Sequence, residues 1–136
     1  MTAEIDDQTT AYVLVAQTCF EDLKQVAGQL AGFLVLAAVG STSGTPEHPV
    51  LKSAELVYRR AEDALKSLRV SKPARPHHAH LLRAAASLKT ALSSTHRRRD
   101  FLPLLESAQA ELLAASRALP GFQMLAFDRG CCAIRK

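Results

Sequence analysis

A chain of 136 residues is most simply a single domain, and it is long enough to bury a core without disulfide staples. Hydrophobic residues make up 48% of it, but alanine and leucine dominate, aromatic residues are only 5% and tryptophan is absent, which favours close-packed helices over a β-sandwich. The net charge of +4 is unevenly placed, since residues 1–50 carry one base against six acids and residues 51–99 carry twelve bases against three.

The first predicted helix covers residues 9–39. Its most apolar run, 26–40, has 15 residues, fewer than the roughly 20 needed to cross a bilayer, so we expect a buried helix and no membrane contact. Gly28 and Gly32 share one face, which favours a kink or a close contact with a second copy of the chain. The apolar stripe, spaced by four and three residues, consists of Tyr12, Ala16, Cys19, Leu23, Val26, Leu30, Phe33 and Ala37.

The second predicted helix covers residues 46–70, with Thr45 as N-cap and Pro46 in the first helical position. Its outer face carries two acid–base pairs in the favourable order, four residues apart. The first pair joins Glu55 to Arg59 and the second joins Glu62 to Lys66. The stripe on its inner face consists of Ala54, Tyr58, Ala61, Leu65 and Leu68.

The third predicted helix covers residues 76–96 and begins at Pro76, and the fourth covers 101–119, with Asp100 as N-cap and Pro103 in its first turn. Residues 120–136 are expected to form a short irregular tail. Four amphipathic helices with short connections predict an all-α, antiparallel up-down four-helix bundle in one domain, 1–136. The third stripe is His78, Leu81, Ala85, Leu88, Leu92 and Thr95, and the fourth is Phe101, Leu105, Ala108, Leu112, Ala115 and Leu119.

Three histidines, His77, His78 and His80, stand at the start of the third helix. Together with the adjacent Cys131 and Cys132 of the tail they could supply the nitrogen and sulfur ligands of a metal site, although their spacing matches no zinc finger. The alternative is that His78 packs on the core stripe while the other two are solvated. The odd number of cysteines and the acidic, signal-free start favour reduced thiols in the cytoplasm. We expect no cofactor.

The segment "HAHLLRAAASL", residues 78–88, resembles the signature helix of histidine-phosphotransfer domains, which are themselves small helical bundles. The resemblance is local, over about residues 77–92. It matches His80 to the phosphoryl acceptor, followed by Leu82, Arg83 and Ala84 in the positions of a leucine, a base and a small residue. It implies that His80 attacks a partner's aspartyl phosphate and that Arg83 stabilises the phosphoryl oxygens. The spacing of Arg75 and His80 is also similar to that of helical ribonucleases of the HEPN type.

Basic residues of the middle segment offer a second surface for function. Those singled out for contact with nucleic acid or an acidic partner are Arg59, Arg60 and Arg97, Arg98 and Arg99, and further charge comes from Lys66, Arg69, Lys72, Arg75, Arg83 and Lys89. No helix-turn-helix or row of aromatic residues accompanies them. The leading hypothesis is therefore a non-enzymatic interaction protein, a small accessory subunit or adaptor. Its basic face would contact an acidic protein, or a phosphate backbone within a nucleic-acid complex.

Overall fold

The computed structural model describes residues 7–39, 48–94 and 98–118, with the backbone alone at Arg98 and Arg99. These residues form α1 (Asp7–Ala38), α2 (Pro49–Ser67), the short 3-10 helix η1 (Lys72–Ala74), α3 (Arg75–Ser93) and α4 (Arg98–Ala118), and the described ranges contain no strand. The predicted all-α fold with four helices is confirmed. The predicted tail, 120–136, lies outside the described residues.

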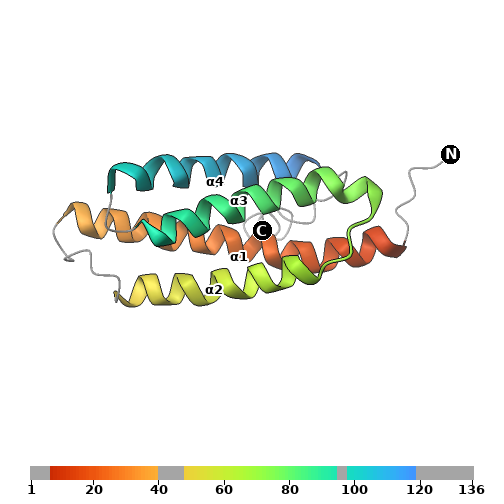
Figure 1. Ribbon diagram of the computed structural model, residues 1–136, viewed down its shortest axis with the longest axis horizontal. Coiled ribbons are helices and arrows are strands. Elements are labelled where there is room, and N and C mark those ends of the chain that lie inside the picture. The colour runs from red at the N-terminus through yellow and green to blue at the C-terminus, as the bar shows by residue number, and fades with distance from the viewer. Residues whose placement is uncertain (1–6, 40–47, 95–97, 119–136) are drawn as a thin grey trace, which may run out of the picture.

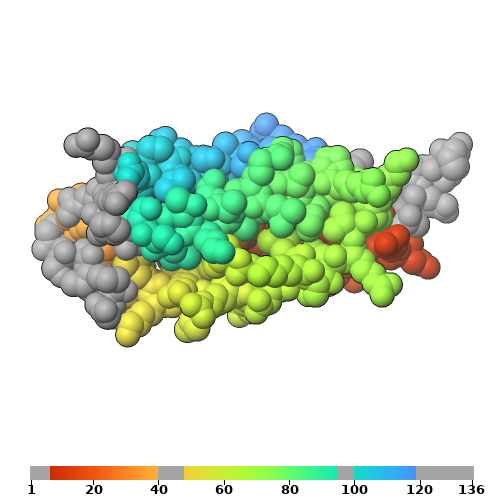
Figure 2. Space-filling view, viewed as in Figure 1, coloured from red at the N-terminus to blue at the C-terminus, as the bar shows by residue number. Residues whose placement is uncertain are grey.

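The helices form an elongated bundle in which successive helices run in alternate directions (Figure 1). α1 packs mainly on α2, and α3 mainly on α4, while α1 also touches both α3 and α4. Figure 2 shows the face made by α2 and α3, with the start of α1 at one end of it. This end gathers the start of α1, the end of α2, the connection 68–74 and the start of α3; it is called the α2–α3 end below.

The predicted stripes of α1, α2 and α4 form most of the core. All eight stripe residues of α1 are buried, and so are four of the five on the second stripe; Leu68 of that stripe is partly buried. Burial of one stripe per helix is what holds short helices together in water, since their intrinsic propensity alone does not. On α4 the buried residues are Phe101, Leu105, Ala108, Leu112 and Ala115, and Leu119 lies outside the described residues.

The ends of α2 differ from the prediction of 46–70. The helix begins at Pro49, where a missing N–H costs nothing, and His48 is its N-cap: its Nδ1 accepts a hydrogen bond from the Val50 N–H at 3.1 Å. The helix ends at Ser67 because Leu68 is extended, with ψ at 137°. The predicted cap, Thr45 with Pro46, lies outside the described residues.

Three further expectations are corrected. α4 begins at Arg98, so Asp100 lies inside its first turn rather than at the N-cap, and there its carboxylate favours the positive end of the helix dipole. Pro103 is the sixth residue of α4 and not part of its first turn. α1 continues without a break through Gly28 and Gly32, which face open space: apart from the neighbouring backbone of α1 itself, a Cβ added at either would have no described atom within 4 Å.

Candidate functional site

The buried histidine of α3 is His77 and not His78. The side chain of His77 is 0% exposed, whereas His78 is only partly buried, so the prediction that His78 occupies the core stripe is wrong. The reason is the register of α3. Its inward stripe repeats at alternating spacings of four and three residues, and this spacing places His77 on the stripe in the first turn. That stripe is His77, Leu81, Ala84, Leu88 and Ala91, with Ala85 buried beside it.

His77 joins α3 to α1 through Tyr12. A hydrogen bond of 2.7 Å links His77 Nδ1 to the Tyr12 hydroxyl, and the two rings meet edge to face with centroids 5.5 Å apart. Burial, with the neighbouring His78 and His80, lowers the pKa of His77 to about 4, and burial also raises the pKa of Tyr12. Both groups are therefore neutral at physiological pH, and the pair is a structural contact of the core.

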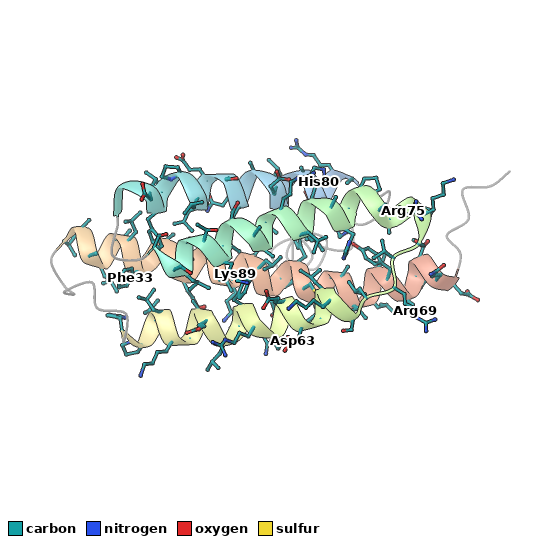
Figure 3. The ribbon with its side chains drawn as sticks, in the orientation of Figure 1. Phe33, Asp63, Arg69, Arg75, His80 and Lys89 are labelled. Carbon is teal, nitrogen blue, oxygen red and sulfur yellow. The ribbon has the colours of Figure 1, made fainter. Side chains whose placement is uncertain are left out.

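His80 lies between α3 and α4 (Figure 3), where it contacts an acid that sequence reasoning missed. His80 Nδ1 is 2.7 Å from Oε1 of Glu111, and Arg83 Nε is 3.3 Å from Oε2 of the same carboxylate. Arg83 Nη2 is also 3.1 Å from His80 Nδ1. The hydrogen bond from His80, helped by Arg83, lowers the pKa of Glu111, so this carboxylate is ionised.

The ionised carboxylate fixes the proton position on the His80 ring. Because a carboxylate only accepts, Nδ1 at 2.7 Å must carry the proton and donate to Glu111. Arg83 then cannot donate to Nδ1, and its remaining partner in the described part is Glu111. In the neutral ring Nε2 has a free lone pair, and the His80 side chain is 26% exposed. Arg75 makes no hydrogen bond or ion pair with His80 in this arrangement.

The metal hypothesis finds no support in the residues that the structure describes. Within them no group of three histidine, cysteine, aspartate or glutamate side chains is arranged to hold an ion. His77 is buried against Tyr12, and His80 is directed to Glu111. Of the other proposed ligands, His78 packs edge to face on Tyr12, and Cys131 and Cys132 lie outside the described ranges.

The predicted basic face is partly neutralised within the bundle. Arg60 donates to both carboxylate oxygens of Asp22 on α1, at 3.0 and 2.8 Å, and so ties α2 to α1. Arg59 pairs with Glu55 at 2.8 Å, and Lys89 of α3 lies 3.8 Å from Glu62 of α2. Arg60 and Arg59, both predicted to contact a partner, are thus each paired with an acid of the same chain.

Four other bases are exposed at the α2–α3 end and recur at every third position. They are Lys66, Arg69, Lys72 and Arg75; none forms an ion pair with another described residue. Figure 3 shows Arg69 and Arg75 near the two ends of the connection between α2 and α3. No acid occurs anywhere between Asp63 and Asp100 in the chain, so nothing in this segment offsets their charge. We call these four residues the basic connection.

The backbone of the basic connection is fixed by contacts of its buried residues. Ser71 is 4% exposed, and its hydroxyl lies 2.7 Å from the hydroxyl of Thr9 on α1 in a buried hydrogen bond. Ala74 is fully buried, and its N–H donates to the Ser71 carbonyl at 3.0 Å. Small buried side chains therefore alternate with exposed bases along 69–75, which presents the bases on a fixed backbone. The predicted cluster of Arg97, Arg98 and Arg99 has no described side chain.

The two acids in these contacts carried little sequence signal, because an acid at the border of an apolar stripe is ordinary. Asp22 directly precedes Leu23 of the α1 stripe. Glu111 directly precedes Leu112 of the α4 stripe. Its pairing with His80 depends on how α3 and α4 are set against each other.

Comparison of the chain with protein-family models, with curated proteins and with solved structures gave no match. Within the described ranges, no helix has the length and apolar character needed to cross a membrane.

Proposed function

We propose that this protein is a non-enzymatic interaction module, a small accessory subunit or adaptor, which binds an acidic partner or a phosphate backbone through the basic connection. The observation that carries the proposal is the set of four exposed bases, Lys66, Arg69, Lys72 and Arg75, on a backbone fixed by buried contacts. Bases on a fixed backbone lose less backbone freedom on binding, and their common sign steers an acidic partner toward this end of the bundle.

The test is affinity capture from the native host with the full chain as bait. A variant with Arg69→Glu, Lys72→Glu and Arg75→Glu is compared with the wild-type chain, and capture is repeated with nuclease and at high salt. We expect the wild-type chain to recover a salt-sensitive assembly that the variant fails to recover. Recovery of the same proteins in the same amounts by both baits contradicts the proposal. Loss on nuclease treatment identifies the phosphate backbone as the acidic component.

We propose histidine phosphotransfer through His80 as a second candidate function. The observation that favours it is the 2.7 Å hydrogen bond from His80 Nδ1 to Glu111, which leaves Nε2 as the nucleophilic nitrogen of a partly exposed ring. Arg83, next to both side chains, would move from Glu111 toward the phosphoryl oxygens. His80→Gln is then expected to abolish labelling by a phosphorylated receiver domain, while His77→Gln retains it. Equal labelling of both variants excludes His80 as the acceptor.

We further propose that copies of the chain associate through α1 and that the protein works in the cytoplasm. The exposed side of α1 from Gln25 to Val39 has no charged residue, and Val35 and Val39 are 61% and 68% exposed on it. Analytical ultracentrifugation of the wild-type chain and of Gly32→Lys tests the association: a dimer that the variant loses is expected, and a monomeric wild type contradicts it. Cys19, a buried free thiol, suits a reducing compartment.

A further inference from the structure

A groove of about 460 Å³ lies between the first turns of α1 and the last turn of α2, at the α2–α3 end. Tyr12, 1% exposed, forms its floor, and Val15 of α1 and Leu68 at the end of α2 form apolar walls. Val15 is 43% exposed although it is aliphatic. Arg69, the second base of the basic connection, lies in the lining of the same groove. An apolar recess and an exposed cation therefore adjoin each other.

The groove is formed before any partner arrives. Tyr12 is fixed by its hydrogen bond to His77, and the connection that carries Arg69 is fixed by the bond between Ser71 and Thr9. Its volume falls within the range of roughly 300–1,000 Å³ that is common for binding pockets. A partner that fills it would therefore gain buried apolar area at little cost in reordering this chain.

The chemistry of the lining discriminates between the two kinds of acidic partner. A nucleic acid offers phosphates to bases and flat rings to exposed aromatic side chains. The one aromatic residue of the lining, Tyr12, is covered, and its hydroxyl is already bonded to His77. The walls offer aliphatic surface instead, which suits the aliphatic side chain of a protein. Arg69, exposed and without an ion pair to another described residue, suits a carboxylate on the same partner.

We infer that this groove binds an acidic amphipathic segment of a partner protein. An aliphatic side chain of that segment inserts against Val15 and Leu68, and a carboxylate nearby on the segment pairs with Arg69. Lys66 and Lys72, three residues to either side of Arg69, attract further acidic residues of the segment. This inference rests on the proposed interaction function and names the class of partner that the basic connection recognises.

The experiment uses the full chain and fluorescence anisotropy of a labelled peptide about four helical turns long, with leucines at helical spacing and glutamates elsewhere. Val15→Asp removes the apolar wall, and Leu56→Asp places the same acid at another exposed apolar site, on α2 and outside the groove lining. Arg69→Glu removes the cation, and Lys52→Glu makes the same change at the other end of α2. We expect Val15→Asp and Arg69→Glu to weaken binding by about tenfold or more. The two control variants should stay within about twofold of the wild type.

Two further probes separate the groove from simple charge attraction. The same peptide with serines in place of leucines, and a short DNA duplex, should bind the wild-type chain weakly and without any response to Val15→Asp. Failure of the wild-type chain to bind the leucine peptide, or equal binding by Val15→Asp and Leu56→Asp, overturns the inference. If the triple change of Arg69, Lys72 and Arg75 abolishes capture from the host while Val15→Asp leaves it intact, the proposed function stands and the groove is not its site.

Discussion

The buried His77 makes a specific prediction about acid stability. Its ring is 0% exposed, and burial lowers its pKa to about 4, whereas an unfolded histidine titrates near 6.5. At a pH between these two pKa values, His77 is protonated in the unfolded chain and neutral in the folded chain. Stability from this group is therefore complete above about pH 6.5 and is lost as the pH falls toward 4.

The size of the effect follows from the two pKa values. Linkage gives a loss of about 2 kcal/mol in the free energy of unfolding between pH 7 and pH 5, and about 3 kcal/mol by pH 4. Urea denaturation at each pH measures this free energy. The variant His77→Gln does not titrate, and its amide can still bond to the Tyr12 hydroxyl. The difference in pH dependence between the two proteins isolates His77 from all other titrating groups.

A second variant separates the hydrogen bond from the titration. Tyr12→Phe removes the hydroxyl that lies 2.7 Å from His77 Nδ1 and leaves a buried polar atom without that partner. This variant should lose about 1–3 kcal/mol of unfolding free energy at pH 7, and its stability should still decline toward acid pH. If wild type and His77→Gln lose stability equally between pH 7 and pH 5, the assignment of His77 as a neutral core histidine is refuted.

Three more predictions concern other parts of the bundle. Gly28→Ala should stabilise the protein by about 0.5–1 kcal/mol in urea denaturation, because this exposed helical glycine faces open space; a loss of stability would show that its face is covered. Glu111→Ala should lower the population of the His80 tautomer that is protonated at Nδ1, as measured by nitrogen NMR; an unchanged population means that Glu111 does not set the proton position. Replacing Arg97–Arg99 with glutamine should lower the affinity for an acidic partner and make that affinity less dependent on salt; equal affinities at every salt concentration exclude this cluster from the interface.

The sequence predicted the bundle because each helix repeats apolar residues at spacings of three and four, and burial follows that spacing closely. Neighbouring positions on a stripe were harder to rank. His77 and His78 differ by one residue, or 100° around the helix; Tyr12 meets both rings edge to face, and only His77 is fully buried. The late start of α2 had a local cause as well: two prolines, Pro46 and Pro49, both suit a first helical position, and His48 supplies the cap for the second.

The candidate site was less predictable because its contacts join residues distant in the chain. His80 and Glu111 are 31 residues apart, and Arg60 and Asp22 are 38 apart. A helical pattern gives the face of each residue but not the partner that it meets on the next helix. The sequence did indicate excess positive charge in the middle segment. It did not indicate which bases remain available to a partner, because that depends on contacts between distant residues. Arg60 is paired with Asp22, whereas Arg69 is exposed.

The most direct test of the interaction function is the salt dependence of binding to the partner recovered by capture. Affinity is measured over a series of salt concentrations for the wild-type chain and for the variant with Arg69→Glu, Lys72→Glu and Arg75→Glu. We predict that wild-type affinity falls steeply with salt and that the variant loses both affinity and most of that salt dependence. Equal affinities and equal salt dependence in the two proteins would contradict the assignment of the basic connection as the binding surface.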